Sequence, residues 1–486
     1  MMRPSSAART GAGLLCLSVL SACAVGPDFH APPPPRNMSY GVELPVSADA
    51  GPLRPDAPVP DRWWTRFRSP AIDALVDRAL RNNPSLDAAR AALRAARELT
   101  AAQRGAYLPQ VGASVSPGHQ SFARTLASPT QAGNSVYDLT TSQLTVGFAP
   151  DLFGANRRAV ESLAAQQDVA RFELSAAQQA LAANVVVAAV TDAELRAQID
   201  ETRRLIAIQR SIALSIERQL ALGQSARADL LAQRALLAQT EAGLPPLERQ
   251  RAINRDLLAA LLGTSPGEVE IAGVELDGLV LPADLPVRLP AELVRHRPDV
   301  RMAEAALHAA SAEIGIAVAA RLPDVQIDAA AGSAALHLLP GFGPGTSFWT
   351  VTGSITQPLF AGGQLRHRQK AAQAAFDQAD ATYRGAVIGA VQNMADALHA
   401  VLADGDAATA ARALDTAAGD SLDIARRQEA LGDVSATTVL QAETVARQAR
   451  LALIQARATQ LTDVAALYLA LGGADPGAPE GRGTSR

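Results

Sequence analysis

The chain has 486 residues, a formal net charge of -4 at pH 7, and 48% hydrophobic but only 4% aromatic residues. This mildly acidic balance excludes a broad basic surface of the kind that binds nucleic acid. A composition rich in alanine and poor in aromatics is typical of long helices packed through small side chains, rather than of one thick globular core.

Residues 1–22 have the pattern of a secretory signal peptide. Arg3 and Arg9 precede a short apolar stretch, and small residues lead to Cys23. The string Leu20-Ser21-Ala22-Cys23 resembles a lipobox, which predicts a covalent N-acyl diglyceride and palmitate on Cys23. Ala24 in the next position resembles lipoproteins sorted to the outer membrane. Because Cys16 lies in the removed segment, the mature chain would hold no thiol for a disulfide or metal site.

After Cys23, residues 23–62 are rich in proline, which predicts an extended arm rather than a helix or a central strand. Beyond the arm the sequence indicates a tandem duplication, because motifs recur in the same order at offsets of about 207 to 214 residues. The first predicted repeat covers 63–263 and the second covers 291–472. A linker over 264–290 joins them, and residues 473–486 are predicted to be a disordered tail. The paired motifs are Asn83-Pro84 with Arg297-Pro298, Leu108-Pro109 with Leu322-Pro323, Leu152-Phe153 with Leu359-Phe360, Leu222-Gly223 with Leu431-Gly432, and Leu262-Gly263 with Leu471-Gly472.

Each repeat has one predicted plan, which is a helix, two strands, a very long helix, a glycine turn and a returning helix. The long helices are predicted over 155–222 and 364–431, and the returning helices over 224–262 and 433–471. A rise of 1.5 Å per residue makes the first long helix roughly 100 Å long. Its narrow apolar stripe requires neighbours in a coiled-coil-like arrangement. Pro245 and Pro246 are expected to break or kink the first returning helix.

The predicted strands are 108–116 with 142–150, and 323–332 with 348–358, joined by loops around 117–134 and 341–345. Leu144, Val146 and Phe148 alternate with polar or small residues, as do Trp349 and Val351 in the second pair. Such alternation suits a strand between lipid and water, and it also suits a half-buried soluble strand. Four strands are too few to close a transmembrane barrel, since about eight is the smallest number that does. A barrel would therefore be shared between chains.

At this point the sequence resembles the outer-membrane factor family of TolC-like channels, in the NodT-type lipoprotein branch that serves resistance-nodulation-division efflux systems. The resemblance implies a mainly α fold with a small β part. In that fold a long antiparallel helical barrel adjoins a homotrimeric, twelve-stranded transmembrane β-barrel. It is carried by Cys23-Ala24-Val25-Gly26-Pro27-Asp28-Phe29, Trp63-Trp64 with Phe67, Asn82-Asn83-Pro84, Arg295-His296-Arg297-Pro298-Asp299-Val300-Arg301 and Gln357-Pro358-Leu359-Phe360-Ala361-Gly362-Gly363.

The resemblance also implies a passive exit duct in the outer membrane of a Gram-negative bacterium, lipid-anchored and with a long periplasmic portion. Its partners would be a periplasmic adaptor (membrane fusion) protein and an inner-membrane efflux pump, in a system of the kind that confers multidrug resistance. Neither catalysis nor a cofactor is expected, because the pump supplies the energy. The seven histidines are scattered, and no catalytic constellation or metal site is predicted.

The two glycine turns are the predicted periplasmic entrance of the duct. Helical-turn and adaptor-docking candidates are Gly223, Gln224, Ser225, Gly432 and Val434. Gate candidates are Arg227, Asp229 and Asp433. In well-known family members aspartates just past the second turn form a constriction, but Thr438 and Gln441 occupy those places here.

Two other functions fit part of the pattern. A non-channel periplasmic coiled-coil lipoprotein would share the lipobox and the helices, but it would not need amphipathic strand pairs in both halves. A TolC-like exit duct for type I protein secretion would share the channel, although the lipobox favours drug efflux. The transported substrates are not encoded in a duct that accepts whatever its pump delivers.

Overall fold

A computed structural model describes residues 24–33, 39–41, 53–55, 57–121, 136–268, 273–288, 290–336 and 344–473. The predicted signal peptide, Cys23 and residues 474–486 of the predicted tail lie outside the described residues. The chain divides into two compact units, described separately below. Unit 1 comprises Met1–Pro32, Ala92–Ala170 and Ala303–Tyr383, and unit 2 comprises Pro33–Ala91, Arg171–Met302 and Arg384–Arg486.

The described elements follow the same order in the two halves of the chain. Helices α3 and α7 have 22 residues each, α4 and α8 have 67 and 68, and α5 and α9 have 35 each. Two strands separate the first and second helix of each half. The bounds are β1 (Leu53–Pro55), η1 (Trp63–Phe67), α2 (Pro70–Asn82), α3 (Pro84–Gly105), β2 (Gln110–Ser121), β3 (Val136–Phe148), α4 (Ala155–Ala221), α5 (Arg227–Leu261), η3 (Pro266–Glu268), η4 (Leu276–Gly278), β4 (Leu285–Val287), α6 (Pro290–His296), α7 (Pro298–Ala319), β5 (Asp324–Ala335), β6 (Ser347–Thr356), α8 (Gln364–Leu431) and α9 (Ala436–Ala470).

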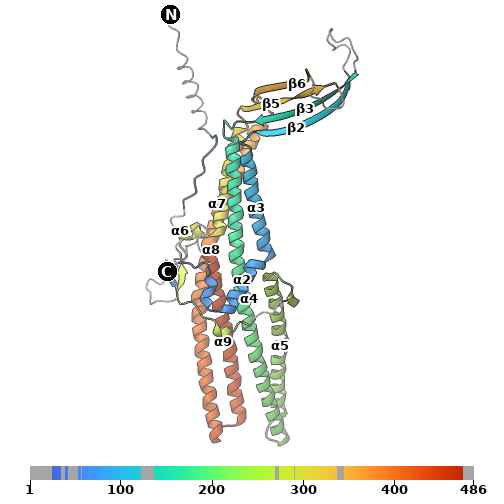
Figure 1. Cartoon of the computed structure of the whole chain (residues 1–486). Coiled ribbons are helices and arrows are strands. Elements are labelled where there is room, and N and C mark those ends of the chain that lie inside the picture. The colour runs from blue at the N-terminus through green and yellow to red at the C-terminus, as the bar shows by residue number, and fades with distance from the viewer. Residues whose placement is uncertain are drawn as a thin grey trace, which may run out of the picture. The chain divides into compact units, whose positions relative to one another are not determined.

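Unit 1 contains a four-stranded antiparallel sheet in the order β2-β3-β5-β6 (Figure 1). Its strands extend beyond the predicted ranges on the side of the connections. The expected loop around Pro117 is wrong, because Pro117 pairs with Thr140 inside β2. Proline is tolerated there because β2 is an edge strand, whose outward side needs no backbone N–H donor.

Unit 2 contains the distal part of α4 with α5, and the distal part of α8 with α9. Ion pairs join α4 to α5 at Arg203–Glu248 and Arg210–Glu241, at 2.7 Å each. The predicted break at Pro245 and Pro246 is wrong, since α5 runs through both prolines. Both prolines are exposed, so water can satisfy the carbonyl groups that lose their helical partner. The flanking ion pairs hold α5 on α4 on either side of them.

The predicted arm and linker meet in unit 2. Three residues of the arm form β1, which pairs in parallel with β4 in the linker. Nearby, the Trp63 ring stacks on Tyr468 with centroids 5.1 Å apart, and the side chain of Phe67 is fully buried. The linker is also fixed to α9, because Arg450 and Arg457 donate to the Asp277 carboxylate at 2.6 and 3.2 Å. The Leu53–Pro55 part of the arm and strand β4 of the linker therefore belong to the core of unit 2.

Three described helices, Ala155–Ala221, Pro298–Ala319 and Gln364–Leu431, contain an 18-residue stretch apolar enough to cross a membrane by length and composition. Alanine and valine supply much of this hydropathy. Between 33% and 50% of each stretch is buried within the chain itself, so packing against other helices accounts for part of the apolar surface.

Candidate functional site

The strand register gives the sheet of unit 1 one apolar face. Val111, Val146, Ala329 and Val351 form one row across the four strands. Since residues two apart on a strand point to the same side, the next row lies on the same face. That row consists of Ala113, Leu144, Ala331 and Trp349, and Phe148, Ile327, Val325 and Ile355 continue the face.

The opposite face is polar or small. Its rows consist of Gln110, Gly147, Asp328 and Thr352, then Gly112, Thr145, Ala330 and Thr350. The register thus aligns the two alternating series predicted in the separate strand pairs. The apolar face is uncovered, with side chains such as Trp349 and Ile355 exposed by 76% and 74%. Along β6 these two residues are separated by roughly 20 Å, close to the apolar band of about 25 Å on barrels that cross an outer membrane.

Both edges of the sheet are open. Among the described residues, β2 and β6 each pair with one neighbouring strand. An edge of 10 to 12 residues beside an apolar face leaves a row of backbone groups that need either water or another strand.

The turn between α4 and α5 is built on Gly223. With φ at +75° this residue adopts the left-handed conformation that closes a helix, and Gln224 N–H donates to the Gln219 carbonyl at 2.8 Å. The Asp229 carboxylate accepts from Ala226 N–H at 3.1 Å and from the Ser225 hydroxyl at 3.2 Å. Asp229 therefore caps the start of α5.

The turn between α8 and α9 repeats this geometry with Gly432. Its φ is +82°, and Asp433 N–H donates to the Gln428 carbonyl at 2.9 Å. Here the N-cap is Ser435, whose hydroxyl oxygen accepts from Thr438 N–H at 3.3 Å. Thr438, which takes the place of a family aspartate, is thereby part of a helix cap. Val434 packs on an apolar cluster of α8 and α9 that includes Leu422, Ala425 and Val439.

The three gate candidates are charged residues at these two turns. Arg227, Asp229 and Asp433 are all exposed, and the side chains of Arg227 and Asp433 form no ion pair with any described residue. The two turns are at the same end of the bundle in unit 2, because Ser215 near the end of α4 lies 3.4 Å from Thr437 at the start of α9.

Two motifs that marked the repeats in the sequence donate hydrogen bonds to the ends of the returning helices. Asn83 donates its side-chain amide to the Leu261 carbonyl at 3.0 Å, at the end of α5. Arg297 donates Nη1 to the Ala470 carbonyl at 3.0 Å, at the end of α9. A Cβ on Gly472 would come within 2.8 Å of Arg297 Cα, so this approach requires glycine.

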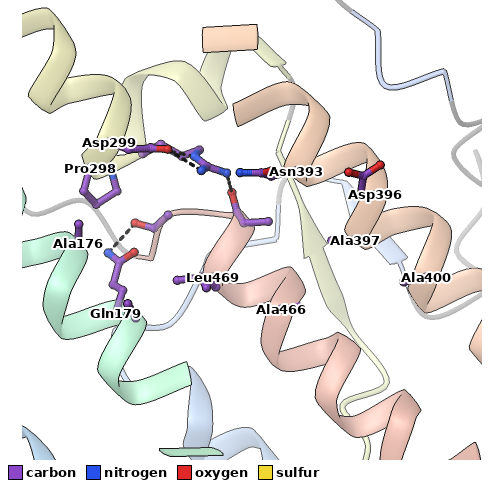
Figure 2. A pocket seen from close by; sticks show the side chains of 14 residues that line it. Ala176, Gln179, Pro298, Asp299, Asn393, Asp396, Ala397, Ala400, Ala466 and Leu469 are labelled. Carbon is purple, nitrogen blue, oxygen red and sulfur yellow. Dashed lines mark hydrogen bonds and ion pairs between the residues drawn. The ribbon is translucent and has the colours of Figure 1, made fainter. Parts of the chain in front are cut away.

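A cavity of about 510 Å³ lies beside the second of these contacts, within unit 2 (Figure 2). Asp299 and Gln179 line it together with Asn393, Asp396 and several alanines. Asp299 accepts two hydrogen bonds from Arg297, at 2.9 and 2.6 Å, and Gln179 donates to the Gly472 carbonyl at 2.7 Å. The side chains of Asp299 and Gln179 are therefore already engaged in hydrogen bonds that hold the end of α9.

A pair of carboxyl groups faces between α8 and α9 in unit 2. The pKa of Asp463 is raised from 3.8 to about 7 because the group is partly buried and Asp404 lies beside it. One carboxylate oxygen of Asp463 is buried with no hydrogen-bond partner among the described residues. The described part of the chain contains no cluster of three or more His, Cys, Asp or Glu side chains that could hold a metal ion.

The sequence did not predict that Asn83 and Arg297 bind the ends of α5 and α9. It also did not predict that Asp404 and Asp463 lie side by side. For the first, a signal existed, since each residue directly precedes the proline that begins a helix and each half ends in Leu-Gly. For the second, the two aspartates are separated by 58 intervening residues, and no local pattern links them.

An amphipathic sheet with two open edges, joined to helices of nearly seventy residues, defines a class of protein: the subunit of an outer-membrane channel. Solved channels have this fold. The outer-membrane channel OprN matches with a TM-score of 0.82 at 27% identity, covering 93% of this chain and 99% of that one. The MtrE outer-membrane channel of Neisseria gonorrhoeae, in its open state, matches with a TM-score of 0.80 at 26% identity, covering 93% and 98%.

The chain belongs to the outer membrane efflux protein family, whose model matches residues 75–264 and 289–473. The toluene efflux pump outer membrane protein TtgF of Pseudomonas putida is 32% identical over 470 residues, 94% of this chain and 96% of that protein. The pyoverdine export outer membrane protein OpmQ of Pseudomonas aeruginosa is 28% identical over 471 residues, with 94% and 96% covered.

Proposed function

We propose that the chain is a lipid-anchored exit duct that works as a homotrimer, receiving substrates from a periplasmic adaptor and an inner-membrane pump and conducting them passively outwards. The observation that carries this proposal is the sheet of unit 1, with its exposed apolar face, its polar face and its two open edges. In lipid, each unpaired backbone group at such an edge would cost several kcal/mol. Pairing β6 of one copy with β2 of the next removes every edge.

Pairing β6 with β2 is a head-to-tail contact, because the two edge strands differ. The two separate matches to one family support an internal duplication of the chain, so the two halves can be compared at equivalent places. In the first half, residues of the arm contact the junction between β3 and α4, where Phe153 O accepts from Val25 N–H at 3.1 Å and Leu152 is 37% exposed. In the second half, Leu359 and Phe360 at the equivalent junction are 93% and 91% exposed. We assign that surface to the next copy in a closed ring, since a heterologous contact that closes leaves no surface unpaired.

The helices supply the periplasmic tunnel of this duct. At 1.5 Å per residue, α4 and α8 are each about 100 Å long. The turns at Gly223 and Gly432 are the proposed adaptor-docking end, with Gln224, Ser225 and Val434 beside them. No catalytic step is assigned to the protein, because the pump and not the duct supplies the energy.

The trimer and its barrel are tested together by paired cysteines. A cysteine at Ser114 in β2 is combined in turn with one at Thr350, Thr352 or Ser354 in β6. Oxidation is expected to give covalent dimers and trimers for one register, and planar bilayers should show ion conductance for the purified protein. The matched control places the β2 cysteine with one at Thr145 in the central strand β3. A soluble monomer without conductance would overturn the proposal and favour a coiled-coil spacer.

The entrance is tested by removing charge without removing the helix cap. Asn at Asp229 can still accept the hydrogen bonds that begin α5. Conductance and cation selectivity are therefore compared for Asp229→Asn, Asp433→Asn and the double variant, with Asp406→Asn on α8 as the control. Reduced cation selectivity in the first three alone supports a charged entrance. Unchanged selectivity in the double variant removes these residues from the gate.

The partners are tested by identifying the adaptor and the inner-membrane transporter that co-purify with the protein. Association with an efflux pump supports drug or solvent efflux, in line with the toluene efflux and pyoverdine export named for the relatives. Association with a type I secretion system instead would replace the efflux assignment while keeping the channel.

A further inference from the structure

Residues 24–29, here called the arm anchor, lie in a groove made of glycines in unit 1. Ala24 packs on Gly154, where an added Cβ would come within 2.7 Å of Ala24 Cα. Gly26, with φ at +98°, lies on Gly315 of α7, and a Cβ on Gly26 would be 2.5 Å from Gly315 Cα. Side chains at these positions would prevent the approach of the two backbones. The close packing of the arm anchor on α7 therefore requires glycine at Gly26 and at Gly315.

Arg158 on α4 holds the arm anchor through its backbone. Its Nε donates to the Val25 carbonyl at 3.1 Å, and its Nη2 donates to the Gly26 carbonyl at 3.3 Å and to the Asp28 carboxylate at 2.8 Å. The Arg158 side chain is only 4% exposed, so it is buried by the contact. The hydrogen bond and charge of Arg158 lower the pKa of the Asp28 carboxyl. A buried guanidinium requires such partners, because an unpaired buried charge is strongly unfavourable.

A second layer fixes Arg158 and the far end of the arm anchor. Glu161 accepts from Arg158 Nη1 at 2.8 Å and contacts His308 Nε2 at 2.9 Å. Burial would raise the pKa of Glu161, but hydrogen bonds from His308 and Arg158 outweigh it and lower that pKa. The His308 ring in turn stacks on Phe29, with centroids 4.4 Å apart and planes 12° from parallel. The arm anchor is thus held at its beginning, middle and end.

We propose that Arg158 is a latch that fixes the arm anchor to the junction between β3 and α4. The residue before the anchor is Cys23, and consecutive Cα atoms are about 3.8 Å apart. The latch therefore sets where an acyl chain on Cys23 enters the membrane, one residue from Gly154. A free arm reaching to Pro32 would instead allow a displacement of roughly 30 Å. This consequence rests on the acylation included in the proposed function, whereas the latch itself does not.

The described residues of the second half contain no such latch. His367 occupies the place of Arg158. Its backbone N–H donates to the Gly363 carbonyl, just as the backbone N–H of Arg158 donates to the Gly154 carbonyl. His367 is exposed, as are Leu359 and Phe360 before it. Within the described part of the chain, the latch is therefore built in the first half and not in the second.

Thermolysin, which cleaves before large apolar residues, measures the latch at the bond between Asp28 and Phe29. In the full-length purified protein, stacking on His308 should protect this bond. Arg158→Gln is expected to increase the cleavage rate at least about tenfold, because proteolysis follows the population of the locally opened state. Arg158→Lys should give an intermediate rate, since it keeps the charge near Asp28 but not the bonds to both carbonyls. The matched control is Arg157→Gln, which changes the exposed neighbouring arginine.

Gly26→Ala tests the latch from the other side, because it displaces the arm anchor without altering α4. It should match Arg158→Gln in cleavage rate while helix content is unchanged. Equal cleavage rates in the unmodified protein, Arg158→Gln and Gly26→Ala would overturn the latch, whether or not the protein conducts ions. The mass of the released Cys23–Asp28 fragment reports acylation independently. Slow cleavage of the Asp28–Phe29 bond, with a released fragment whose mass shows no lipid, would reject acylation and keep the latch.

Discussion

Replacing Asp463 by asparagine should stabilise the protein at high pH and not at low pH. In the folded chain the pKa of Asp463 is raised from 3.8 to about 7, first by burial and then by the neighbouring Asp404. The folded state therefore favours the neutral carboxyl group, whereas the unfolded state ionises near 3.8. Asparagine has the shape of the neutral group and cannot ionise. The substitution thus removes a cost that exists only when Asp463 is charged.

The sign and size of the effect follow from this difference in pKa. Asp463 contributes its full stability below about pH 4, loses it as pH rises, and has lost it above about pH 7. A shift of three pKa units corresponds to about 4 kcal/mol at 1.36 kcal/mol per unit. Asp463 is only partly buried, so solvent screening reduces this to about 1–2 kcal/mol. The stabilisation by Asp463→Asn should therefore be about 1–2 kcal/mol at pH 8 and near zero at about pH 4.

Thermal unfolding followed by circular dichroism at both pH values measures this difference. For a chain of this length, about 1–2 kcal/mol corresponds to a rise of about 1–4 °C in Tm. Asp404→Asn should give a smaller rise at pH 8, because it removes the charge that repels Asp463 but leaves the burial of the Asp463 carboxylate unchanged. Asp406→Asn, on the same helix but exposed, is the control. An equal effect of Asp463→Asn at both pH values would refute the reasoning, since it would show that ionisation is not involved.

Two further substitutions test the helix ends. Gly432→Ala should lower stability by about 1 kcal/mol, because φ is positive at this turn, whereas Gly419→Ala within α8 should raise it by about 0.5–1 kcal/mol. Thermal unfolding of the pair distinguishes a turn effect from a general effect of alanine. Arg297→Ala should cost about 2–3 kcal/mol, because it leaves the Ala470 carbonyl without its donor, while Arg295→Ala on the exposed side should be nearly neutral. Equal midpoints of denaturant unfolding for these two variants would contradict the role of Arg297 at the end of α9.

The helices could be predicted from the sequence because their signals are local. No glycine or proline lies between Ala155 and Leu222, and a glycine stands at each end of this stretch. The ends of α4 were therefore predicted within one residue, and both glycines have positive φ in the structure. The strands were predicted by alternation, but the lengths of β2, β3 and β5 were underestimated. Pro117 is a poor guide to a strand end when the strand lies at an edge, and the difference between edge and centre is a tertiary property.

The candidate sites were less predictable for the same reason. Asp229 is a charged residue near a turn in the sequence, but its carboxylate caps α5 in the structure. The roles of Arg158 and Asn83 depend on partners about 130 and 178 residues away. Motif resemblance marked the arm anchor and Asn83 as features of a family, but only the folded chain shows which backbone groups they bind.

The two halves of the chain differ at the surface that the proposed ring contact would use. Where Arg158 and Gly315 receive the arm anchor, the junction at Phe153 is completed within the chain. Where His367 replaces the arginine, the equivalent surface at Phe360 is uncovered. Because an exposed apolar junction is costly in water and the proposed closed ring would remove it, the difference between the halves would favour assembly in a single direction. A chain with two identical halves would lack that bias, since either half could then follow either in the ring.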